Sequence, residues 1–158
     1  MKKVLSTAAI LAATALPLMA MPVGSAHAAD DVTTYETQGD FEDVAAEVND
    51  AIVNQGYVVD YHGFIGDMLK RTAEDVGSDK VLYENAEFFQ FCSAVLSRKV
   101  METDIGNIAY CPYVVFVYEL ADKPGTVTIG YRKLPAGGPR DEVNKLLGEV
   151  IAEAAEGL

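Results

Sequence analysis

The sequence feature that most constrains the fold is the stretch from residue 88 to 119, which holds both cysteines and the longest apolar strand candidate. An aromatic segment ends at Cys92, a polar helical segment follows, and Cys111 precedes the run from Val114 to Val117. Because that run is apolar throughout, we expect a central strand that is covered on much of both faces. If the two strand candidates are neighbours, the two cysteine sulfur atoms should lie close in space.

The first 28 residues have the pattern of a secretory signal peptide. Lys2 and Lys3 open the chain, an apolar block covers residues 8–20, and an A-x-A site ends at Ala28. The apolar block is too short for stable membrane insertion. We therefore predict a signal peptide over 1–28 and a single domain over 29–158. The predicted location is periplasmic or secreted, and thiols can oxidise there.

The charge of the chain restricts the partners it can have. Residues 1–28 contain two lysines and no acidic residue, so the net charge of −12 becomes −14 after cleavage. A surface this acidic repels phosphate groups, so nucleic acid and anionic membranes are poor partners for this chain. A cation, a basic partner or simple solubility is consistent with it.

Periodicity along the mature chain predicts an α+β fold. Helical spacing of apolar residues marks both the first helix after Asp40 and the last helix before the C-terminus. We expect an antiparallel sheet of four to five strands, with helices packed on one face in a β-α-β-β-β-α-like order. The expected strands cover residues 29–37, 57–62, 81–91, 113–120 and 126–131. A second copy would cover the other face, so we expect a homodimer.

The segment from Tyr57 to His62 carries the only histidine of the mature chain. Strict alternation would turn Tyr57, Val59 and Tyr61 toward the core and would place Asp60 and His62 together on the opposite face. A carboxylate beside an imidazole can orient a histidine that binds a ligand or transfers a proton. A solvated polar face explains the same pattern without a function.

Several segments resemble the family known as domain of unknown function DUF302. They are Gly56-Tyr57-Val58-Val59, the segment from Arg71 to Gly77, Phe91-Cys92-Ser93-Ala94, and the segment from Asn107 to Tyr113 ahead of Val-Val-Phe-Val-Tyr-Glu. The resemblance covers essentially the whole mature chain. It implies a compact α+β fold and a dimer, and it implies fold rather than a particular activity.

Standard catalytic motifs are missing from the sequence. There is no Cys-x-x-Cys, Gly-x-Ser-x-Gly, His-Glu-x-x-His, phosphate-binding loop or dinucleotide fingerprint. The candidate site residues are therefore the soft and aromatic ones. They are Cys92 and Cys111, with His62 and Met101 as auxiliary ligands.

These residues allow three interpretations. The first is a non-enzymatic binding or accessory module that holds a small ligand near the two cysteines, namely copper, haem or a sulfur species. Thiolate, thioether and imidazole groups suit copper(I) or haem iron as ligands. The second is a thiol-dependent redox enzyme. The third is a structural Cys92–Cys111 disulfide, which would stabilise the domain by about 3 kcal/mol in the chain-entropy model.

Overall fold

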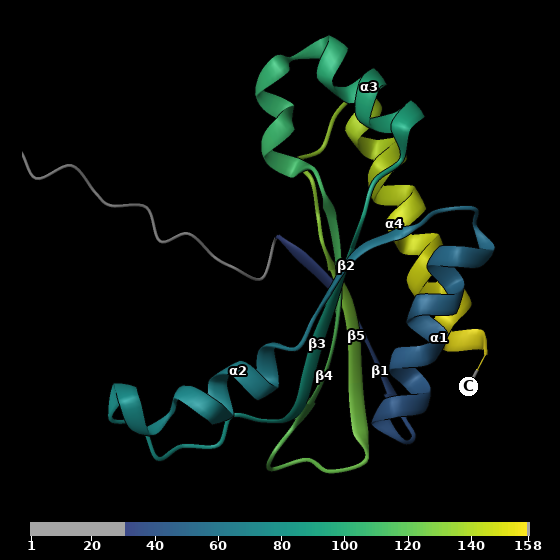
Figure 1. The fold of residues 1–158 in the computed structure, drawn as a ribbon. Coiled ribbons are helices and arrows are strands. Elements are labelled where there is room, and N and C mark those ends of the chain that lie inside the picture. The colour runs from purple at the N-terminus through teal and green to yellow at the C-terminus, as the bar shows by residue number, and fades with distance from the viewer. Residues whose placement is uncertain (1–30, 158) are drawn as a thin grey trace, which may run out of the picture.

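The structure, a computed structural model, describes residues 31–157, so the predicted signal peptide lies outside the described residues. A five-stranded antiparallel sheet with the strand order β1-β5-β4-β3-β2 forms its centre (Figure 1). The strands are β1 (Val32–Gln38), β2 (Val59–Gly63), β3 (Tyr83–Phe91), β4 (Tyr113–Leu120) and β5 (Thr126–Arg132). This architecture confirms the predicted α+β class.

Two long helices, α1 (Phe41–Asn54) and α4 (Pro139–Glu156), lie side by side on one face of the sheet (Figure 1). The prediction placed all helices on that face, but α2 (Ile65–Thr72) lies on the other side, next to β3. Short 3-10 segments, η2 (Glu74–Val76) and η3 (Ile105–Tyr110), follow α2 and α3 (Ala94–Thr103). No helix over residues 31–157 is long and apolar enough to cross a membrane.

Helix α1 begins after Asp40, as its sequence predicts, and a glycine follows its end. The Asp40 side chain accepts a hydrogen bond from the Glu42 backbone N–H, which satisfies one free donor of the first turn. Gly56 adopts a φ of 85° directly after the helix, a conformation that glycine takes without strain. The predicted apolar stripe is the buried face, and it comprises Phe41, Val44, Ala45, Val48, Ala51 and Ile52.

The core lies between these two helices and the sheet. Along β4 burial alternates strictly, so that Tyr113, Val115 and Val117 are buried against the helices and the residues between them are only half-buried. The apolar run therefore does not signal burial on both faces. The second face of the sheet, which we call the open face, presents Phe88, Phe116 and Tyr118 with partial exposure.

The predicted orientation of β2 is wrong for two of its residues. A β-bulge between Val59 and Tyr61 adds one unpaired residue, and an extra residue reverses the side to which all later side chains point. His62 therefore pairs with Phe89 and stacks on its ring, with ring centres 4.2 Å apart, on the helix-covered face. Tyr61, expected in the core, is 56% exposed and packs against Phe88 on the open face.

Candidate functional site

The sulfur atoms of Cys92 and Cys111 lie 2.7 Å apart, which confirms that the two cysteines are close in space. Cys92 directly follows β3 and Cys111 closely precedes β4, and these strands are neighbours with Phe91 opposite Tyr113. The distance is shorter than a normal contact between sulfur atoms and longer than the covalent bond of about 2.05 Å. Both residues are free cysteines in the structure, and both are half-buried.

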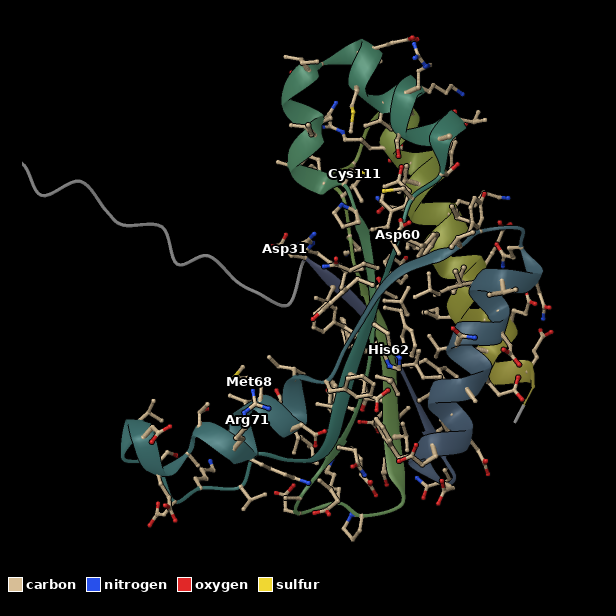
Figure 2. The ribbon with its side chains drawn as sticks, in the orientation of Figure 1. Asp31, Asp60, His62, Met68, Arg71 and Cys111 are labelled. Atoms are coloured by element: carbon tan, nitrogen blue, oxygen red, sulfur yellow. The ribbon has the colours of Figure 1, made fainter. Side chains whose placement is uncertain are left out.

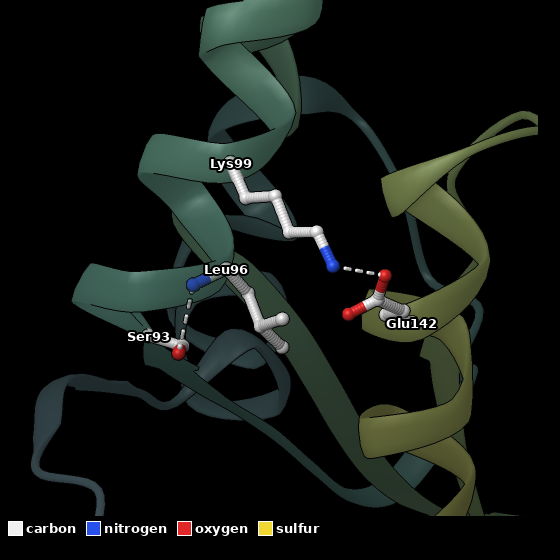
Figure 3. Close-up of polar contacts among 4 residues, drawn as sticks. All are labelled: Ser93, Leu96, Lys99 and Glu142. Atoms are coloured by element: carbon white, nitrogen blue, oxygen red, sulfur yellow. Dashed lines mark hydrogen bonds and ion pairs between the residues drawn. The ribbon is translucent and has the colours of Figure 1, made fainter.

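The chain between the cysteines forms a small helical lobe, residues 93–110, which we call the α3–η3 lobe. Ser93 caps α3 because its side-chain oxygen accepts a hydrogen bond from the Leu96 backbone N–H (Figure 3). Lys99 then pairs with Glu142 and so connects α3 to α4 (Figure 3). The buried Asn107 donates to the Val100 carbonyl oxygen at 2.9 Å and holds η3 against α3. The two cysteines are thus the base of a folded lobe.

A polar chain approaches Cys111 from the interior. The hydroxyl oxygens of Ser97 and Tyr113 are 3.0 Å apart, and the Ser97 oxygen is 3.7 Å from the Cys111 sulfur. Burial raises the pKa of Tyr113, although its hydrogen bond to Ser97 acts in the opposite direction. Tyr113 therefore stays protonated at neutral pH and can donate to Ser97, which can donate to Cys111.

Cys92 has a different environment. Burial, followed by the hydrogen bond and charge of Cys111 and the charge of Asp60, raises the pKa of Cys92 to about 12, while a backbone hydrogen bond from Tyr113 acts to lower it. In the reduced protein the Cys92 thiol is accordingly protonated at neutral pH. Because the thiolate is the nucleophile, a protonated Cys92 thiol is a weak nucleophile at neutral pH.

Cys92 also borders a surface depression of about 660 Å³. Its rim includes Val58 and Val95, which are 73% and 76% exposed. The complete lining consists of Gly56, Tyr57, Val58, Asp60, Cys92, Ser93, Ala94, Val95 and Leu96. Cys111 is not among the residues that line this depression, so the depression gives access to the pair at Cys92.

The two auxiliary candidates are placed differently. Figure 2 shows His62 well down the sheet from Cys111, where its Nε2 lies 2.7 Å from a Glu87 carboxylate oxygen. Met101 is half-buried on α3, within the α3–η3 lobe. Over residues 31–157, no three His, Cys, Asp or Glu side chains are grouped so that they could hold a metal ion.

Ser97 and Tyr113 were not predicted as site residues. Ser97 follows Ser93 by four residues on a predicted helix, and Tyr113 follows Cys111 by two on a predicted strand. The spacings place Ser97 one helical turn after Ser93 and Tyr113 two residues after Cys111. Only the packing of α3 against the start of β4 brings the two hydroxyl groups together.

The fold and the site together define a small α+β domain with a paired dithiol at the adjoining ends of two inner strands, β3 and β4. Residues 33–156 match the family model described as "Domain of unknown function DUF302", and the chain belongs to this family. Among solved structures, it is similar to "uncharacterized conserved protein DUF302 from Bacillus stearothermophilus", with a TM-score of 0.62 and 13% identity, covering 78% of this chain and 97% of that one. At this identity the similarity shows the fold alone. Comparison with curated proteins found no match.

Proposed function

We propose that this protein is an exported redox-responsive accessory module in which Cys92 and Cys111 form a reversible disulfide. The observation that carries the proposal is the 2.7 Å distance between their sulfur atoms. In the reaction, the two thiols lose two protons and two electrons as the sulfur–sulfur bond forms. An external disulfide accepts the two protons and two electrons and is thereby reduced to two thiols.

The same distance favours a disulfide over a metal held by both cysteines. Two sulfur atoms bound to one tetrahedral metal at about 2.3 Å stand about 3.8 Å apart. The observed pair is closer than that, and His62 has Glu87 as its polar partner. A copper, haem or sulfur-species site at these cysteines is therefore less well supported than a disulfide.

Reversibility is supported by the position of the pair. A disulfide buried on all sides resists exchange, whereas an accessible one is open to attack by thiols. Here both cysteines are half-buried and Cys92 borders an open depression. The bond would close the base of the α3–η3 lobe, so oxidation would also restrain that lobe.

Two further features belong to this proposal. The basic start, apolar block and A-x-A site of residues 1–28 support export to a compartment where disulfides persist. The open face supports a homodimer, because Phe88, Phe116 and Tyr118 remain partly exposed on one continuous sheet surface. A second copy of the chain would remove this apolar area from water.

The test is a count of free thiols in protein purified from the exported fraction and denatured without reductant. We expect none before reduction and two after it, with a smooth transition in glutathione buffers of increasing oxidising strength. Cys92→Ser and Cys111→Ser are matched controls that retain one thiol throughout. Two free thiols that persist in oxidised glutathione would overturn the proposal. Copper or haem absorbance that saturates in the wild type and is lost in Cys111→Ser would replace it with the ligand-binding interpretation.

A further inference from the structure

We infer that external thiols exchange with this pair at Cys92, and that the natural partner is a dithiol polypeptide whose reactive cysteine is flanked by apolar and basic side chains. The inference rests on the proposed reversible disulfide. It adds which sulfur atom reacts and what the partner must look like.

The first argument is access. Cys92 borders the depression between the end of α1 and the start of α3, whereas Cys111 lies outside its lining. The neighbours of Cys111 are the Ser97 hydroxyl and the sulfur of Cys92 itself. A thiol that enters through this depression therefore meets the Cys92 sulfur first.

The second argument concerns the leaving group. An external thiolate attacks Cys92 Sγ, the bond to Cys111 Sγ breaks, and the electron pair of that bond remains on Cys111. The Ser97 hydroxyl lies 3.7 Å from this sulfur and can donate to it, since Tyr113 can donate to Ser97 at 3.0 Å. A donor that stabilises the departing thiolate speeds its departure.

The exchange is completed by the second thiol of the partner. This thiol attacks the partner's own sulfur in the mixed disulfide, so the partner leaves as an internal disulfide. Cys92 leaves as a thiolate and takes up a proton, as does Cys111. Two electrons have then passed from the partner to this protein, and no other reagent is needed.

The third argument is charge complementarity. The Asp60 carboxylate lines the same depression as Cys92, and the mature chain carries a net charge of −14. Anionic thiols are repelled from such a site and cationic thiols are attracted to it. A polypeptide with lysine or arginine beside its cysteine therefore fits better than an acidic small thiol.

The fourth argument concerns the rim. Val58 and Val95 line the depression and are largely exposed to water, Val58 from the α1–β2 connection and Val95 from the first turn of α3. Apolar side chains of a partner segment can pack on both while its cysteine reaches Cys92. Together with Asp60, these residues select an apolar and basic segment.

The experiment measures reduction of the oxidised, signal-cleaved protein by three small thiols at low salt. The thiols are cysteamine, 2-mercaptoethanol and 3-mercaptopropionate, whose non-reacting ends are positive, neutral and negative. Each rate is divided by the rate at which the same thiol reduces a small uncharged disulfide, because the nucleophilicity of a thiolate changes with its pKa. We expect the normalised rates to fall in that order, by about threefold to tenfold overall. An interaction of about 1 kcal/mol between the Asp60 carboxylate and a charge a few ångströms away in water implies a change of this size. In Asp60→Asn the ratio between the fastest and the slowest normalised rate should be close to one. Asp79→Asn, an exposed carboxylate beside α2, should leave it unchanged.

The site of attack is read from the same reactions after rapid alkylation. We expect intermediates that carry the external thiol on Cys92 and the alkyl group on Cys111. Ser97→Ala should slow all three thiols by a similar factor, because it removes the donor to the leaving sulfur and not the charge. Two peptides that both carry lysine after their cysteine test the apolar rim. The peptide with leucine before the cysteine should react faster than the peptide with serine there. The combined variant Val58→Ser and Val95→Ser should lose that advantage.

The outcomes separate the two proposals. If no disulfide forms in the exported protein, the proposed function fails. If the disulfide forms and is reduced normally, but the external thiol is found on Cys111 or the rates do not depend on charge, the proposed function stands and this inference is overturned.

Discussion

The ring of Phe116 on β4 occupies the space that a side chain on Gly130 of β5 would need. The two residues are paired across the strands, and a Cβ atom on Gly130 would lie 2.5 Å from Phe116 Cζ and 2.7 Å from the Thr33 carbonyl oxygen. Gly130 therefore allows an aromatic ring to lie flat on the open face.

This relationship predicts the effect of Gly130→Ala. The added methyl group must displace the ring or the backbone of β1, so we expect a loss of about 1–3 kcal/mol in the free energy of unfolding. Gly148→Ala on α4 is the matched control, because its nearest neighbour, Tyr131 Oη, lies at an ordinary 3.7 Å. That change should stabilise the helix by about 0.5–1 kcal/mol. Urea denaturation of both variants tests the pair, and a neutral Gly130→Ala would contradict it.

The reduced protein should lose stability at alkaline pH. The pKa of Cys92 is raised in the folded state, chiefly by burial, so the folded state holds its proton more tightly than the unfolded state does. Its contribution to stability is complete below the ordinary thiol pKa and is lost as the pH rises from there to about 12.

The oxidised protein provides the control for this pH effect. It has no Cys92 thiol to titrate, while the raised pKa of Tyr113 gives the same direction of change in both forms. We therefore expect the urea midpoint of the reduced protein to fall more than that of the oxidised protein between pH 8 and about pH 10.5. Parallel changes in the two forms would mean that Cys92 is not buried as described.

The proposed dimer predicts a difference between two exposed tyrosines. Tyr61 lies on the open face, whereas Tyr35 on β1 lines a depression beside α4 on the helix-covered side. Light scattering at micromolar concentration should give about twice the monomer mass for the wild type. Tyr61→Asp should lower that mass and Tyr35→Asp should not. A wild type that is monomeric at every concentration would contradict the dimer.

The predicted signal peptide has a direct mass signature. Cleavage after Ala28 gives an exported protein that begins at Ala29. Intact-mass spectrometry of the exported fraction measures this start. A replacement of Ala28 by a bulky residue should block cleavage and leave the longer chain, and an exported protein that retains Met1 would contradict the prediction.

Local signals in the sequence were sufficient to predict most of the fold. The apolar stripe of α1, its start after Asp40 and the strand β4 follow from periodicity and capping, which depend on near neighbours in sequence. The bulge at Asp60 could not be read in this way, because it depends on how β2 pairs with β3, and so His62 was assigned to the wrong face.

The site was predicted to a similar extent. The closeness of Cys92 and Cys111 was predicted on the condition that the two strand candidates are neighbours, and β3 and β4 meet that condition. The link from Tyr113 through Ser97 to Cys111 required the packing of a helix against a strand, which no spacing encodes.

The pairing of β1 with β5 has a consequence for the order in which the chain can fold. Val32 lies opposite Arg132 and Gln38 opposite Thr126, so the first strand pairs only with the last one. When a polypeptide emerges from a ribosome or a translocation pore N-terminus first, β1 appears before every other element and has no partner until about 90 further residues have followed. Contacts this distant in sequence form late and slowly. The N-terminal edge of the sheet should therefore gain protection during synthesis only after β2, β3 and β4 have emerged and can pair.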